Sequence, residues 1–109
     1  MVVGAAGQPW TESEIEEVLD AYFEMLVWQL DGTSFVKAEV RSEVESKLPA
    51  RAKKSIELKW CNVSAVLEEH GLPRVEGYKP LPHYQALLAD SVDAWLKHHR
   101  ATARAISLS

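Results

Sequence analysis

A cluster of cationic side chains stands just before a predicted helix in the middle of the chain. Arg51, Lys53 and Lys54 follow Pro49 closely, and Lys47 precedes it as a candidate flanking contact. Guanidinium and ammonium groups bind phosphates, and the amides at a helix N-terminus add partial positive charge in the same direction. The cluster therefore predicts contacts with nucleic-acid phosphates. A solvated basic turn is the alternative interpretation.

Three polar side chains lie together on one face of the same predicted helix. Ser55, Lys59 and Asn62 recur at helical spacing. Asparagine pairs with adenine and lysine with guanine in the major groove, so these residues are candidates for reading base edges. The alternative is structural, with Asn62 bridging neighbouring segments and Lys59 lying along Trp60. The predicted DNA-binding residues are Arg51, Lys53, Lys54, Ser55, Lys59 and Asn62.

The remaining chemistry-bearing residues form no catalytic or metal-binding pattern. Cys61 is the single cysteine, which leaves no intrachain disulfide and argues against a cysteine-based metal site. His98 and His99 are adjacent on a predicted helix, so their rings point in different directions and would not chelate one ion together. No spacing suggests a Ser/His/Asp or Cys/His arrangement. We therefore expect no catalytic residue, no metal and no cofactor, and we do not expect the chain to be an enzyme by itself.

Charge is distributed unevenly along the 109 residues, a length that suits one domain. The formal net charge is −4, so the chain as a whole is not a basic nucleic-acid-binding protein. Glu12–Asp31 contains seven acidic and no basic residues, whereas Lys47–Lys59 contains five basic residues and one acid. This separation gives a dipole that can orient the molecule on a polyanion. Because no apolar run approaches a membrane span and no basic leader is present, we expect a cytoplasmic protein.

The first predicted helix begins at a capping box. Residues 1–9 are expected to be a flexible lead, and Thr11 with Glu14 then forms a T-x-x-E motif that satisfies the first amides of a helix. Apolar side chains recur with helical periodicity as far as Asp31-Gly32. These side chains are Ile15, Val18, Leu19, Tyr22, Phe23, Leu26 and Leu30.

A second helix is expected before Pro49, with Thr33 or Ser34 as its N-cap. Arg41 is expected to pair with Glu45, one turn later on the same face. The helix has a narrow apolar stripe suited to packing on the first helix. The stripe consists of Val36, Val40, Val44 and Leu48.

The third helix is expected from Lys53 to His70, with Gly71 ending it. Residues 72–82 contain three prolines and are expected to form an extended strap over the helices. A fourth helix from Tyr84 to about Arg104 follows, with residues 105–109 as a tail. The buried face of the third helix consists of Ile56, Trp60, Val63 and Leu67. The predicted fold is all-α, with a three-helix helix-turn-helix core, the strap and a closing helix in one domain over residues 10–104.

One pattern of residues resembles the Myb/SANT three-helix family. It consists of Trp10-Thr11-x-x-Glu14 and then Leu48-Pro-x-Arg51-x-x-x-Ser55-Ile56-x-x-Lys59-Trp60-x-Asn62. The resemblance implies a Myb-like fold whose third helix enters the major groove of DNA. The chain departs from the pattern because the family's tryptophan triplet is not reproduced. Phe35 stands near the second tryptophan position, and the first helix is longer than usual.

Several motifs in fixed order over residues 10–96 resemble a second family. They are Trp10-Thr-x-x-Glu14-Ile15, Ala21-Tyr22-Phe23-x-Met25-Leu26, Lys37-Ala38-Glu39, Arg51-x-x-x-Ser55-Ile56-Glu57-x-Lys59, Asn62-Val63-Ser64-Ala65-Val66-Leu67, Gly71-x-Pro73, Gly77-Tyr78-Lys79-Pro80 and Tyr84-Gln85. This order is similar to the N-terminal helical domain of bacterial HNH nucleases and related McrA-like, type IV modification-dependent restriction proteins. The chain departs from it at Val36 and at Ala52-Lys53-Lys54. The resemblance implies an accessory domain that binds double-stranded DNA, unmodified or modified, for a nuclease located elsewhere in the protein.

A protein-interaction or dimerisation module is the alternative function. The acidic first helix would form the contact through a wide apolar arc that includes Val27 and Trp28. The negative net charge favours this interpretation, since DNA repels an acidic surface. The mass of the protein in solution, with and without Trp28→Ser, would distinguish a homodimer from a monomer.

Overall fold

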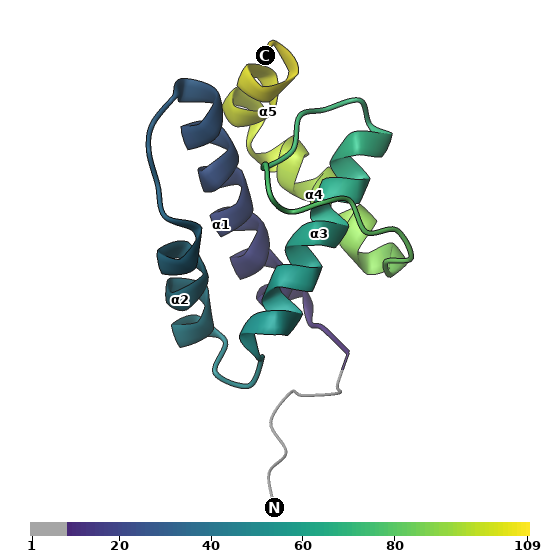
Figure 1. Cartoon of the computed structure of the whole chain (residues 1–109). Coiled ribbons are helices and arrows are strands. Elements are labelled where there is room, and N and C mark those ends of the chain that lie inside the picture. The colour runs from purple at the N-terminus through teal and green to yellow at the C-terminus, as the bar shows by residue number, and fades with distance from the viewer. Residues whose placement is uncertain (1–8) are drawn as a thin grey trace, which may run out of the picture.

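The computed structural model describes residues 9–109 (Figure 1). These residues form five α-helices joined by loops, and they contain no strand. The helices are α1 (Glu12–Asp31), α2 (Lys37–Lys47), α3 (Lys53–Glu69), α4 (Ala86–His98) and α5 (Arg100–Ser107). The predicted all-α class is confirmed. The flexible lead expected at the N-terminus falls, apart from Pro9, outside the described residues. None of these helices combines the length and apolar character that a membrane crossing needs.

α1 begins and ends where the sequence predicts. The amide of Glu14 donates to the Thr11 hydroxyl at 3.2 Å, and the amide of Thr11 donates to the Glu14 carboxylate at 3.1 Å. These two bonds complete the predicted capping box. Gly32 ends the helix with a φ of 75°, a left-handed conformation that glycine adopts without steric cost. α1 then contacts every other helix, which accounts for its wide apolar arc.

α2 begins later than predicted and has no side-chain cap. Its N-cap residue is Val36, so the expectation that Thr33 or Ser34 caps the helix is wrong. Phe35 instead packs against Trp28 of α1, with ring centroids 5.6 Å apart, and the segment before Lys37 contains no helical turn. A tertiary aromatic contact therefore sets where this helix starts.

Only part of the predicted apolar stripe of α2 is buried. Val44 and Leu48 belong to the core, whereas 53% of Val36 is exposed. Among the described helices, α2 packs on α1 and α3 alone, and it lies at the outer edge of the molecule (Figure 1). The predicted i,i+4 pair is confirmed, since Arg41 Nε lies 3.4 Å from a carboxylate oxygen of Glu45.

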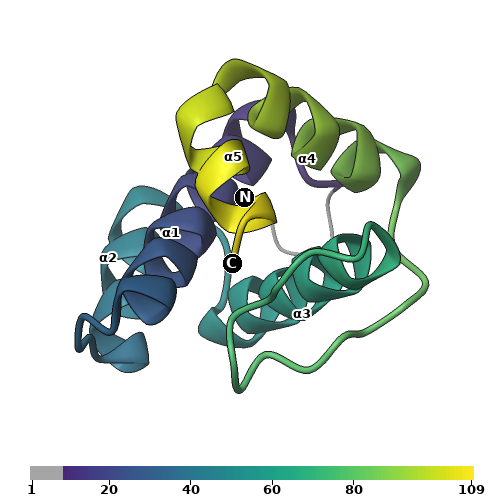
Figure 2. The same ribbon diagram turned by 90° about the horizontal axis from the view of Figure 1, so that it is seen from above.

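α3 is the central helix of the fold. Its predicted apolar face is fully buried, and α1, α2 and α4 all pack on the helix. The indole of Trp60 donates to the carbonyl of Val18 at 3.0 Å, which fixes α3 against α1. The predicted strap, which extends from the end of α3 to the start of α4, runs alongside α3 (Figure 2). α3 is therefore enclosed along most of its length.

The single fourth helix predicted from Tyr84 to Arg104 is two helices, α4 and α5. The chain breaks at His99, where φ is −125° and ψ is 60°. Trp95 explains the break, because its ring lies between those of Phe23 and His99, with centroid distances of 4.0 and 3.7 Å. Stacking on the tryptophan holds His99 in a conformation that a continuous helix does not allow.

The break returns the C-terminal part of the described chain to α1 (Figure 2). Ile106 of α5 is fully buried, so residues 105–107, predicted as part of a tail, belong to a helix that contributes to the core. The indole of Trp95 donates to the carboxylate of Asp20 at 2.8 Å. The first helix is therefore covered by the last two.

Substitution of Val36 by serine is expected to stabilise the protein. A serine at this extended N-cap position can accept from the amide of Glu39, and Glu39 stands where it completes a capping box. We expect the free energy of unfolding, measured by urea denaturation, to rise by about 0.5–1 kcal/mol. Ser34→Ala is the control and should leave stability unchanged, because Ser34 caps nothing. Destabilisation by Ser34→Ala would show that the helix starts earlier.

Candidate nucleic-acid interface

Exposed lysines surround the point where α2 ends and α3 begins. Lys47, Lys53 and Lys54 are exposed, and residues 48–52 join the two helices at one end of the molecule (Figure 1). The N-cap of α3 is Ala52, which supplies no side-chain hydrogen bond, and the first turn contains no acidic residue. The first amides of α3 are thus left for an external acceptor. We call Lys47, Lys53, Lys54 and these amides the basic edge.

Arg51 has a structural position, contrary to its predicted role as a phosphate contact. Only 6% of the residue is exposed. Its Nε and Nη2 donate to the two carboxylate oxygens of Glu14 at 3.0 and 2.8 Å, and Nη2 also donates to the carbonyl of Pro9 at 2.9 Å. The guanidinium lies 4.5 Å from the ring centroid of Trp10. Arg51 therefore holds the start of α1 against the turn that precedes α3.

The Arg51 hydrogen bond also changes the acidity of Glu14. It is the main cause of a pKa lowered from 4.5 to about 2, with burial opposing it and the amide of Thr11 reinforcing it. The carboxylate accepts from both the helix cap and the guanidinium, and both interactions favour its charged form. Glu14 therefore couples the local start of α1 to a residue far along the chain.

Lys59 and Asn62 are likewise turned into the fold, so their predicted base contacts do not agree with the structure. Only 8% of Lys59 is exposed, and its ammonium lies 5.0 Å from the ring centroid of Trp10. Burial, and then the nearby charge of Arg51, lowers the pKa of Lys59. Asn62 donates to the carbonyl of Leu81 at 2.7 Å and so ties the strap to α3. The structural alternative stated for Asn62, a bridge between neighbouring segments, agrees with this bond, whereas Lys59 lies over Trp10 and not along Trp60 as that alternative expected.

The surface that remains at the basic edge is smaller than the predicted set. Lys53 and Lys54 are exposed, and Ser55 is half-buried beside them. Leu58, one turn after Lys54, is 43% exposed. Lys47 on α2 adds a cation from the neighbouring helix. The structure therefore places Lys47, Lys53, Lys54 and Ser55 around the N-terminal tip of α3, while most of the rest of the helix is covered.

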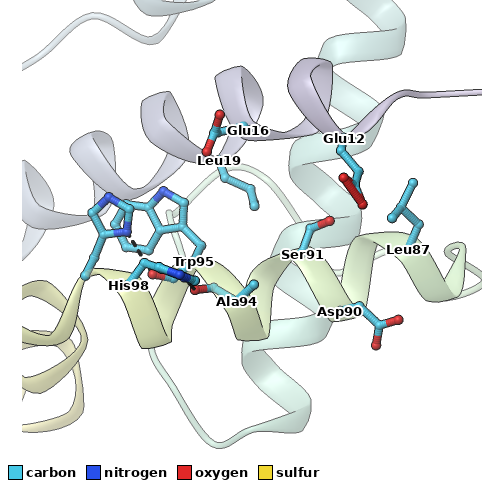
Figure 3. Close-up of a pocket in the computed structure, with 10 residues that line it drawn as sticks. Glu12, Glu16, Leu19, Leu87, Asp90, Ser91, Ala94, Trp95 and His98 are labelled. Atoms are coloured by element: carbon cyan, nitrogen blue, oxygen red, sulfur yellow. Dashed lines mark hydrogen bonds between the residues drawn. The ribbon is translucent and has the colours of Figure 1, made fainter.

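A hollow with a volume of about 450 Å³ lies between α1 and α4 (Figure 3). Glu12 and Glu16 of α1 and Asp90 of α4 are among the residues that line it. His98 and His99 are held by hydrogen bonds from their Nδ1 atoms to the carbonyls of the residues four positions earlier, at 2.7 and 2.8 Å. Within residues 9–109, no group of three or more histidine, cysteine or carboxylate side chains is placed to hold a metal ion.

Comparison with protein-family models, with curated proteins and with solved structures finds no match to this chain. The surfaces of the molecule itself must therefore indicate its function.

Replacement of Arg51 by alanine is expected to destabilise the fold. It would leave the largely buried Glu14 carboxylate without its main partner and remove the contact with Trp10. We expect a loss of about 3 kcal/mol in the free energy of unfolding. Arg41→Ala is the matched control, because Arg41 pairs with two more exposed carboxylates, and it should cost less than about 1 kcal/mol. Equal losses for the two variants would contradict a structural role specific to Arg51.

Stability should depend on pH through Glu14. The folded-state pKa is lowered, so the interaction stabilises the protein above the ordinary pKa of 4.5, and this stabilisation is lost as the pH falls toward about 2. Glu14→Gln keeps a capping-box side chain but not the charge. Urea denaturation between these pH values should therefore show a shallower loss of stability in Glu14→Gln than in the parent. Identical slopes would show that Glu14 is not coupled to Arg51 in solution.

Proposed function

We propose that this domain binds double-stranded DNA through the basic edge. The observation that carries the proposal is the uncapped N-terminus of α3 next to the exposed Lys53 and Lys54. Backbone amides and the helix dipole attract a phosphate there, and the ammonium groups bind those on either side. In this role the chain is a non-catalytic module of a modification-dependent restriction endonuclease or a related bacterial defence nuclease, acting in the cytoplasm.

The unpaired state of the lysines supports the proposal. Within residues 9–109, Lys47, Lys53 and Lys54 have no ion-pair partner, whereas Arg41 and Arg51 are both occupied by carboxylates. Cations that are free of internal partners can neutralise phosphates without first breaking a bond. Glu14, the acidic residue of α1 that lies beside the basic edge, is already paired with Arg51, so an acidic protein can still bind DNA in one orientation.

The tip of α3, rather than its whole length, would approach the duplex. Residues from Ile56 to Leu67 are largely buried, so the helix has no long face to place in the major groove. In helix-turn-helix proteins the N-terminal residues of the recognition helix contact the bases. With α3 as the recognition helix, this geometry needs only the N-terminal tip of α3. On this proposal α1, α2 and α3 form a Myb-like unit. Ser55 is then the residue of α3 best placed to add a hydroxyl donor.

The restriction role depends on the resemblance over residues 10–96, and cleavage would come from another part of the protein. Recognition of modified bases would be visible as a preference among duplexes. The protein-interaction role considered as the alternative concerns the acidic side of α1. It uses a different face of the molecule and is compatible with DNA binding at the basic edge.

The double variant Lys53→Ala/Lys54→Ala should lose DNA affinity. Titration of a duplex of about 20 base pairs, unmodified, methylated or phosphorothioated, should show binding that weakens with salt. Removal of two phosphate contacts should lower affinity at low salt by about tenfold or more and reduce the salt slope by about two. Arg51 stays in place, because its loss would disturb the fold.

The control is Lys79→Ala/Lys97→Ala, which changes the net charge equally at exposed positions on the strap and on α4. This variant should bind like the parent. Equal affinities for the parent and Lys53→Ala/Lys54→Ala would refute DNA binding at the basic edge, and so would an equal loss in the control.

A further inference from the structure

A groove lined by both apolar and acidic side chains runs between α1 and α2. Its volume is about 520 Å³. Its apolar lining includes Trp28 of α1, Phe35 of the connecting segment, and Val36 and Val40 of α2. Since 53% of Val36 is exposed and the other three are only half-buried, the described chain leaves this surface partly uncovered. We call this surface the α1–α2 groove.

Carboxylates border the α1–α2 groove on both sides. Glu17 and Glu24 belong to α1, and Glu39 and Glu43 belong to α2. None of these four side chains has a hydrogen-bond or ion-pair partner within residues 9–109. Asp20, which also lines the groove, accepts from the indole of Trp95. These carboxylates outnumber Lys47, the one cation among the described residues that line the groove, so a cationic partner would relieve their mutual repulsion.

We propose that the α1–α2 groove binds a basic amphipathic helix of a partner protein. Two packed helices present a groove that a third helix can fill with a ridge of side chains. The apolar floor would receive a leucine-like ridge, and the four carboxylates would pair with lysine or arginine on both flanks of the ridge. The 11 residues of α2 span roughly 16 Å, so the bound segment needs about three turns.

Charge disfavours two other occupants of the α1–α2 groove. DNA would be repelled by the carboxylates that border the floor. A second copy placed symmetrically would bring the same four carboxylates of each protomer together. The inference stands apart from DNA binding, because the α1–α2 groove shares only Lys47 with the basic edge.

The experiment titrates the full chain with a fluorescent 14-residue peptide made of leucine and lysine, in which the leucines form one helical stripe. The first control peptide has the same composition with the leucines scattered around the helix, and the second has glutamate in place of lysine. We expect binding of the first peptide only. Equal binding of the scattered peptide would overturn the proposal, because it would show attraction by charge alone.

Two protein variants locate the binding surface. The variant Glu39→Lys/Glu43→Lys should bind the striped peptide about tenfold or more weakly, because two attractive charge pairs become repulsive. Glu76→Lys/Asp90→Lys changes the net charge equally on the strap and on α4, and it should bind like the parent. Loss of binding only in this second variant would overturn the proposal and point to the hollow between α1 and α4.

The variant Val36→Ser distinguishes a loss of peptide affinity from a loss of stability. It removes an exposed apolar contact while improving the cap of α2, so affinity should fall about threefold or more although stability is kept or raised. Unchanged affinity would overturn the apolar part of the proposal. The mass of the protein in solution completes the test, since a dimer that Val36→Ser dissociates would identify a second copy as the occupant and refute a partner protein.

Discussion

The contact between Arg51 and Glu14 is the constraint on which the arrangement of the other elements depends. One carboxylate both completes the cap of α1 and receives the guanidinium from the turn before α3. The starts of the two longest helices are therefore fixed to the same group, and Trp10 covers the pair from one side. Because Arg51 is held inward, Lys53 and Lys54, which follow within one turn, are left at the surface.

Burial of α3 divides the surface of the molecule into distinct faces. Its neighbours cover its sides, so only its N-terminal tip is available for a polyanion. Glu17 and Glu24 of α1 and Glu39 and Glu43 of α2 line the groove between these two helices, beside its apolar side chains. Charges that are separated along the chain are thus also separated in space. Such separation lets one small domain present opposite potentials to two kinds of partner.

Capping motifs and helical periodicity predict those parts of the fold that residues close together in the sequence determine. The Thr11–Glu14 capping box and the apolar periodicity of α1 and α3 depend on residues within a few turns, and the structure confirms them except at Leu30, which is exposed at the end of α1. The break at His99 depends on a ring stacked on Trp95, which in turn packs on Phe23 far earlier in the chain. Helical periodicity cannot register such a contact, so two helices were predicted as one.

The candidate site was predicted in part, for the same reason. The basic cluster was visible in the sequence, and Lys53 and Lys54 are exposed as expected. A buried arginine and an exposed arginine look alike in a sequence, and only the approach of Glu14 from 37 positions away decides which one Arg51 is. Asn62 likewise has the type and spacing of a base-reading residue, but the strap that returns beside it occupies its amide.

The hydrogen bond between Trp95 and Asp20 has a consequence for synthesis on the ribosome. It joins residues 75 positions apart, and α5, which also contacts α1, follows later still. Until those segments emerge, the apolar side of α1 that they cover in the folded state is exposed to solvent or to other chains. Closure of such distant contacts is slow, and exposed apolar surface promotes aggregation. Among the five described helices, α1 is thus the first to be made and the last to be fully covered, and its acidic residues help to keep the nascent chain dissolved in the meantime.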